Sequence, residues 1–229
     1  MKAIAFAAAL TALAGGASAA TVFAPTDTVI GGERQGTDFV VGQTAPGSLN
    51  NDWPANEGPV HAIDGVGQKY LNFAKEDSGF LVVGDEAFVV TGAQFWTAND
   101  AVERDPASYE IWGSNAASFS SAAGSSIAMS GFTLVASGLL GLPDTRNAGG
   151  VNALNDANSQ TVSFANASAF SSYLILFPTL KNSSAANSVQ IGEVQLYGEV
   201  VAPVPLPAAL PLLLAGLVGA GAVGRRRGA

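Results

Sequence analysis

Residues 80–96 read FLVVGDEAFVVTGAQFW, and this stretch decides the fold class. Its apolar, β-branched and aromatic residues fall into three short runs, which Gly84, Asp85 and Gly92 separate. Strands favour such residues, and glycine and aspartate mark the turns between strands. The stretch therefore predicts three short β-strands. They cover 80–83, 88–91 and 93–96.

Runs of the same kind recur further along the chain, each bounded by Gly, Pro, Asn or Asp. No window shows the periodicity of a long amphipathic helix, and the Ala/Ser-rich segment 115–128 has room for one helical turn but the composition of a loop. Many short strands with turn signals between them predict an all-β, antiparallel β-sandwich over residues 20–200. The further runs are 109–112, 132–135, 161–164, 173–177 and 189–197.

Alternation within the run 93–96 places Ala93 and Phe95 on one face of the strand and Trp96 on the other. An outward-facing Trp96 could stack on a sugar ring. The alternative is that this indole packs against the core or its edge, as tryptophan more often does in a sandwich. The same two interpretations apply to Trp53 and Trp112.

The composition excludes several classes of site. The chain has 229 residues, enough for one sizeable domain with terminal appendages, and its 48% hydrophobic and 12% charged residues exclude a disordered chain. Without cysteine there is no disulfide, cysteine-ligated zinc or thiol nucleophile. With a single histidine, His61, an H-E-x-x-H metal site is excluded as well.

The charge is concentrated in the middle of the chain. All 18 acidic residues lie between Asp27 and Glu199, where only six of the 10 Lys and Arg residues accompany them. With a pI near 4.4, such a domain attracts cations and argues against a nucleic-acid partner. An acidic surface is also common in secreted proteins that bind no cation.

The N-terminus predicts export. Residues 1–19 read MKAIAFAAALTALAGGASA, in which Lys2 precedes an apolar run that ends in the small residues Ala17 and Ala19 around Ser18. This is the pattern of a secretory signal peptide, cleaved by signal peptidase after Ala19. A buried N-terminal helix is the alternative, which the glycines at 15 and 16 disfavour.

The C-terminal segment 201–229 predicts a membrane-sorting signal. Residues 201–224 carry no charge, and Arg225, Arg226 and Arg227 follow directly. The apolar run 208–224 would form a single transmembrane helix slightly shorter than the ~30 Å core of a bilayer. The arginines place the extreme C-terminus in the cytoplasm.

This segment resembles the VPLPA-type PEP-CTERM protein-sorting domain. The resemblance rests on the motif Val204-Pro205-Leu206-Pro207-Ala208 followed by the span and the arginine cluster. It implies a Gram-negative bacterium, transient anchoring in the inner membrane, and removal of the tail by an exosortase-type membrane peptidase. The protein would then remain at the cell surface or in the extracellular matrix. A permanent single-span anchor is the alternative.

A second resemblance covers most of residues 60–198. Ala62-Ile63-Asp64-Gly65 with 69–73, the run 99–115, and Ile191 to Gly198 are similar, in this order, to galactose-binding-like (discoidin, F5/8 type C) domains. This resemblance implies a jelly-roll β-sandwich that acts as a binding module. The first 40 residues after the predicted cleavage site do not match, and we expect an edge strand or a lead-in there.

The same resemblance implies a calcium site. Loop carbonyls and an oxygen of Asp64 would meet the Glu193 carboxylate of the last strand, and Ca²⁺ accepts such oxygen ligands. Lys69 departs from the family, which often has a hydroxyl residue there, and its ammonium would oppose a nearby cation. The alternative is that Asp64 caps the turn at Gly65 and that Glu193 is solvated or paired.

A loop rich in charged residues precedes the run 109–112. In it, Arg104 could clamp a sugar hydroxyl or carboxylate in bidentate fashion, with Asp100 and Glu103 nearby. The alternative is a structural ion pair that holds the loop. His61 has no nucleophile pattern beside it, and the chain has neither G-x-S-x-G nor a P-loop.

These observations predict a secreted, non-catalytic module that binds extracellular polysaccharide or another glycan. This hypothesis predicts an exposed aromatic residue beside the loops that contain Asp64 and Arg104. A structural protein of the matrix or envelope, without a pocket, is the alternative. A glycoside hydrolase ranks third, and requires two carboxylates roughly 5–9.5 Å apart across a cleft.

Overall fold

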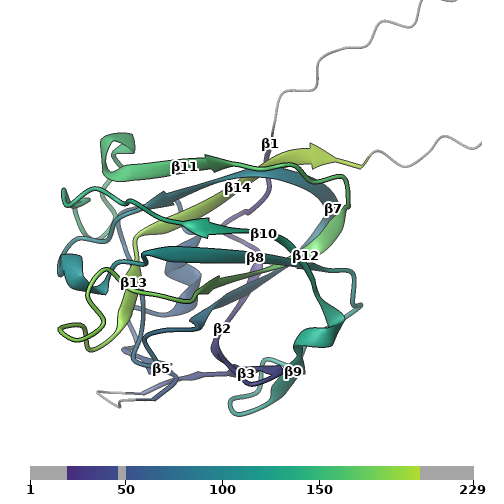
Figure 1. Ribbon diagram of the computed structural model, residues 1–229, viewed down its shortest axis with the longest axis horizontal. Helices are drawn as coiled ribbons and strands as arrows, with labels where there is room; N and C mark the ends of the chain where they lie inside the picture. The colour runs from purple at the N-terminus through teal and green to yellow at the C-terminus, as the bar shows by residue number, and fades with distance from the viewer. Residues whose placement is uncertain (1–19, 46–49, 202–229) are drawn as a thin grey trace, which may run out of the picture.

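The computed structural model describes residues 20–45 and 50–201, and all of the secondary structure given below lies in these ranges (Figure 1). The predicted signal peptide with its cleavage site, the sorting motif, the transmembrane run and the arginine cluster lie outside the described residues. Within the described ranges, no helix has the length and apolar character needed to cross a membrane.

The fold is built along one long strand, β7 (Ser78–Trp96). The three strands predicted between 80 and 96 are wrong as separate elements, because β7 continues through the turn signals at Gly84 and Asp85. Partners pair along both of its edges, and the backbone bends around 84–87 instead of turning back. Neighbouring strands thus override the local turn preference.

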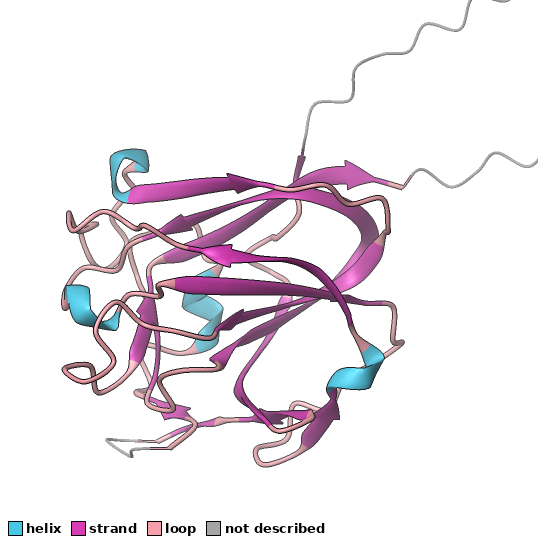
Figure 2. Cartoon of the chain, in the orientation of Figure 1, coloured by secondary structure: helices cyan, strands magenta, loops and turns pink. Residues whose placement is uncertain are grey.

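Four strands flank β7, two in series along each edge. One edge carries β11 (Ser159–Ser163) and then β12 (Phe170–Phe177), and the other carries β14 (Glu193–Val200) and then β2 (Thr28–Gln35). Because β7 bends between its two halves, this ten-stranded sheet curls into two facing layers (Figures 1 and 2).

The remaining strands extend these layers. Beyond β12 lie β8 (Ser108–Ser114) and β10 (Thr133–Leu139), and beyond β2 lie β3 (Asp38–Val41) and β9 (Ser126–Ala128). The predicted all-β, antiparallel sandwich is confirmed, with one parallel pair, β4 with β5. The short elements are β1 (Ala20–Thr21), β4 (Gln43–Thr44), β5 (Asp52–Trp53), β6 (Tyr70–Asn72), β13 (Val189–Ile191), η1 (Pro59–Ala62), η2 (Val102–Arg104), η3 (Met129–Gly131) and η4 (Asp156–Asn158).

A β-bulge in β7 keeps both of its halves facing the core. Val90 pairs with Gly198 and Gly92 with Tyr197, so Thr91 is the extra residue. One extra residue reverses which side chains face inward. Even-numbered residues therefore enter the core up to Val90, and odd-numbered ones after it. The core residues of β7 are Phe80, Val82, Val90, Ala93 and Phe95.

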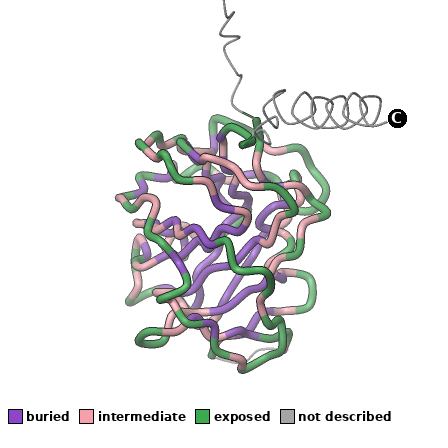
Figure 3. Tube along the Cα trace, turned by 90° about the vertical axis from the view of Figure 1, so that its right-hand side faces the viewer, coloured by how far each residue is buried: buried purple, intermediate pink, exposed green. Residues whose placement is uncertain are grey.

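A second apolar cluster covers the opposite face of the layer formed by β2, β7 and β12. Leu81, Leu174 and Leu176 point to this face, and Ile127 and Phe132 of the segment 115–132 pack onto them. The Ala/Ser-rich segment 115–128 forms no helical turn. Its last three residues form β9, and η3 follows directly after them. Figure 3 shows buried strands enclosed by exposed loops.

The segment before residue 60 takes a larger part in the sheet than expected. β1 is an edge strand on β14, but β2 lies inside the sheet, between β7 and β3. The prediction of a mere edge strand or lead-in is therefore wrong for β2. Its Ile30 is 4% exposed and packs in the second cluster.

Candidate functional site

The loops 56–69, 97–106, 143–158 and 178–192 gather at one end of the sandwich, which we call the loop end. Backbone hydrogen bonds join them, from Gly67 N to Asn152 O (2.7 Å) and from Lys181 N to Asp105 O (2.9 Å). In Figure 1 this end lies to the left, around β13 and η2. Part of the sequence resemblance lies in these loops, including Asp64 and Arg104.

The structure brings Asp64 and Glu193 together, although 128 positions separate Gly65 from Glu193. Gly65 N donates to Glu193 Oε2 (3.1 Å), and Val66 N donates to Asp64 Oδ1 (3.1 Å). Gly65 has φ +76°, in the left-handed region that favours glycine, and this turn presents its N–H to Glu193. The other Asp64 oxygen lies 2.8 Å from His61 Nδ1.

Glu193 is 2% exposed, and its pKa is raised to about 8, mainly because burial disfavours the charged form. The negative charge of Asp64 contributes to this rise, while the hydrogen bond from Gly65 N–H opposes it. Two coupled carboxylates, one of them buried, form an oxygen-donor set that suits a hard cation. The turn cap considered for Asp64 is present at the same time, through Val66 N.

A cation at this position would need further ligands. Within the described residues, no group of three or more His, Cys, Asp or Glu is arranged to hold a metal ion. Backbone carbonyls of the loop and water would have to complete the shell. Calcium tolerates such ligands, so Asp64 and Glu193 fit the ion as two of its six to eight donors.

Lys69, the departure from the family pattern, is the centre of a second charged cluster. Its side chain is 7% exposed, and its Nζ binds both oxygens of Asp100 (2.9 and 2.8 Å). Glu57 Oε1 lies 3.6 Å and Gln190 Oε1 3.4 Å from the same nitrogen. Because two carboxylates compensate this ammonium, it opposes a cation at Asp64 less than the sequence suggested.

A small polar pocket of about 150 Å³ lies beside Lys69. Glu57 and the side chains of Asn56, Gln68 and Asn99 line it. These three amide side chains form no hydrogen bond with any other residue in the described ranges. The predicted ligand-binding residue Asp100 does not line this pocket, but its carboxylate binds Lys69, which does.

Arg104 is not the cation that holds its loop. Its guanidinium makes no hydrogen bond or ion pair within 20–45 and 50–201. Asp105, which is 0% exposed, is bound instead by both terminal nitrogens of Arg146 (2.7 Å each), with Lys181 at 3.3 Å. The structural ion pair exists with a different cation, because the chain returns to this loop from residues 143–147 and 180–182.

The predicted aromatic platform is absent from the described residues. Trp96 lies on the face opposite Phe95 as predicted, but it is 6% exposed and its indole N–H donates to Asp156 Oδ1 (3.2 Å). Trp53 is also buried, and Trp112 is partly buried and bonded to Glu110. No aromatic side chain in the described ranges is exposed, so the expected exposed stacking residue is wrong.

Sequence reasoning missed Lys69, Gln190 and Arg146 as organising residues. Each is bonded to a partner 31 to 121 positions away. One signal was available in the sequence. This acidic domain has few Lys and Arg residues, so each of them is expected to pair with one of the more numerous carboxylates. Which carboxylate a cation reaches is decided by the loop packing.

Comparison with known proteins gives remote structural similarities only. No protein-family profile matches the chain, and no curated protein matches it. Several solved structures are similar to it, among them the following three. The galactose complex of the family 32 carbohydrate-binding module of NanJ from Clostridium perfringens has 16% identity and a TM-score of 0.44 over 79% of this chain and 99% of its own. An F5/8 type C domain from Bacteroides fragilis has 14% sequence identity and a TM-score of 0.46. The match covers 80% of this chain and 98% of that domain. The module CBM32-3 of a family 31 glycoside hydrolase from Clostridium perfringens has 14% sequence identity and a TM-score of 0.46. The match covers 62% of this chain and 83% of the module.

Proposed function

We propose that this chain is an exported, non-catalytic module that binds extracellular polysaccharide through its loop end. The signal peptide 1–19 and the sorting segment 201–229 support export and surface association in this proposal. The sandwich supplies the rigid support on which binding loops are commonly carried.

The pocket beside Lys69 is the observation that carries this proposal. Its unpaired amide side chains offer both donors and acceptors, which is what sugar hydroxyls require. Lys69 is held by Asp100, Glu57 and Gln190, so its orientation is fixed before a ligand arrives. Without an exposed aromatic residue, hydrogen bonds would supply most of the affinity, and we expect weak binding at a single sugar residue.

One observation favours the structural alternative. The described residues expose no aromatic side chain, whereas stacking on aromatic rings is a common way to hold a sugar. A matrix or envelope protein would have no need of such a residue. That alternative predicts no saturable binding of any soluble glycan.

Removing two of the three unpaired amides should weaken glycan binding without affecting the fold. We expect the full chain carrying Asn56→Ala and Gln68→Ala to bind its polysaccharide about tenfold more weakly, because two hydrogen bonds are lost. Asp85→Ala, at an exposed position in the bend of β7, is the control. Titration calorimetry against soluble polysaccharides measures the effect. Equal affinity in the double variant and the control would contradict the loop-end site.

We further propose that calcium binds at Asp64 and Glu193 and stabilises these loops. When bound, the ion would join the 61–66 turn to the start of β14 and balance the two carboxylate charges. At a hundredfold excess over its Kd, calcium should add about 2.7 kcal/mol and raise the melting temperature by several degrees. The rise should increase from about pH 5 to pH 8, because calcium competes with the proton on Glu193.

The control for this prediction is Glu193→Gln, which keeps the shape of the side chain and removes its charge. Its melting temperature should be the same in calcium and in EDTA. A calcium response that survives in both Asp64→Ala and Glu193→Gln would place the ion elsewhere. No response in the unmodified chain would remove calcium from the proposal.

A further inference from the structure

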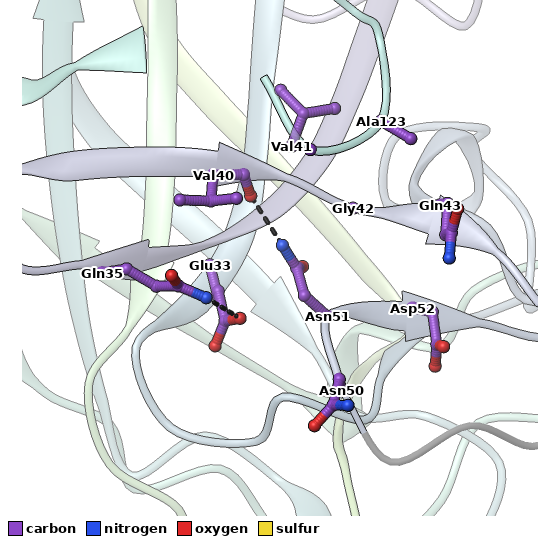
Figure 4. A pocket seen from close by; sticks show the side chains of 11 residues that line it. Glu33, Gln35, Val40, Val41, Gly42, Gln43, Asn50, Asn51, Asp52 and Ala123 are labelled. Carbon is purple, nitrogen blue, oxygen red and sulfur yellow. Dashed lines mark hydrogen bonds between the residues drawn. The ribbon is translucent and has the colours of Figure 1, made fainter. Parts of the chain in front are cut away.

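A cavity of about 510 Å³ lies away from the loop end, between β2, β3, β5 and the turn at 123–124. We call it the Asp52 pocket. Its polar lining consists of Glu33, Gln35, Gln43, Asn50, Asn51 and Asp52 (Figure 4). None of the residues that line it is a lysine, an arginine or a histidine.

Asp52 is a buried carboxylate without a partner. It is 3% exposed, its Oδ1 accepts no hydrogen bond, and it forms no ion pair within the described ranges. β5 alternates, so Trp53 packs in the core while Asp52 points to the opposite side. Burying an unpaired carboxylate is costly, and a protein normally compensates such a charge.

The other polar groups of the pocket differ in how many hydrogen bonds they already form within the protein. Asn51 donates to Val40 O (2.7 Å) and accepts from Asn72 Nδ2 (3.2 Å), so it is part of the wall. Glu33 accepts one hydrogen bond from Gln35 (2.6 Å) and keeps its second oxygen available. The pocket therefore presents two carboxylates, Glu33 and Asp52, together with the amides of Gln43 and Asn50.

This lining selects a ligand that is positively charged and rich in hydrogen-bond donors. The volume is far larger than one metal ion needs and lies within the range of roughly 300–1,000 Å³ typical of organic ligands. We infer that the Asp52 pocket binds a sugar carrying a free amino group, as in a polysaccharide with unacetylated hexosamine units. Its ammonium would pair with Asp52, and its hydroxyls would bond to Glu33 and the amides. This inference rests on the proposed function and names a class of polysaccharide.

Calorimetry on the full chain with three probes tests the inference. The probes are a glucosamine oligomer, its N-acetylated counterpart and free lysine. We expect the glucosamine oligomer to bind at least about tenfold more tightly than the N-acetylated one, because acetylation removes the charge. Lysine should not compete, since it carries the amine without the sugar hydroxyls. Equal affinity for both oligomers, or competition by lysine, would overturn the inference.

Asp52→Asn separates a binding role from a structural one. The variant should lose at least about tenfold in affinity for the glucosamine oligomer. Its melting temperature should rise, because an unpaired buried charge is removed. Glu33→Gln should weaken binding in the same direction, and the exposed Asp85→Asn should leave it unchanged. Unchanged affinity in Asp52→Asn, or a lower melting temperature, would contradict the inference.

The variants at the loop end and in the Asp52 pocket distinguish a failure of this inference from a failure of the proposed function. If Asn56→Ala with Gln68→Ala weakens the binding of neutral glycans while Asp52→Asn has no effect on any probe, the loop-end function stands and the Asp52 pocket does not. If neither set changes the binding of any glycan, both fail.

Discussion

Replacing Asp105 with alanine is expected to lower the free energy of unfolding by about 3–5 kcal/mol. The carboxylate is 0% exposed and binds Arg146 through two parallel hydrogen bonds of 2.7 Å, with Lys181 at 3.3 Å. Without it, two cations that are themselves largely buried lose their common partner. Urea unfolding of the full chain, followed by fluorescence, measures the change.

Asp144→Ala is the matched control for Asp105. Asp144 also binds Lys181 (3.0 Å), but its side chain is 84% exposed. Water screens such a pair, so we expect a loss below about 1 kcal/mol. Similar losses in the two variants would mean that the buried network does not hold the loop end together.

The pH dependence of stability is expected to report on Glu193. In metal-free buffer with EDTA, the free energy of unfolding should fall as the pH rises from about 4.5 to about 8. The sign follows from linkage: the pKa of Glu193 is raised in the folded state, so the folded protein holds this proton more tightly than the unfolded chain does. The slope should approach about 1.4 kcal/mol per pH unit, and the total should reach several kcal/mol.

Glu193→Gln isolates this contribution from that of the other titrating groups. The variant cannot ionise at this position, so its stability should vary much less over the same range. At pH 8 it should be more stable than the unmodified chain in EDTA. A parallel pH profile for both proteins would show that Glu193 does not titrate in this range.

The strands could be predicted from the sequence because strand preference depends on the residues of the strand itself. β-branched and aromatic residues at 80–83, 109–112 and 173–177 predict strands wherever they occur, and all three stretches lie in strands. Alternation likewise placed Ala93 and Phe95 in the core with Trp96 on the other face. Local sequence did not show that Gly84 and Asp85 would be spanned by one bent strand, because the pairing partners along β7 lie far away in the chain.

The candidate sites divide in the same way. Asp64 and Glu193 were linked in advance only through resemblance to a family, and the structure brings them together through the Gly65 turn. Trp96 was placed on the correct face, but alternation does not reveal that a later segment, with Asp156, covers that face. Burial of a side chain on an outer face is set by whatever packs onto it.

By itself, the sequence determined that the chain is all-β, acidic and without cysteine. These properties depend on composition or on short contiguous runs. Tertiary structure alone decided that Lys69 pairs with Asp100, that Arg146 rather than Arg104 holds Asp105, and that Asp52 is buried without a partner. The physical reason is that the strength of a charge interaction depends on separation and burial, and both are set by how distant loops pack.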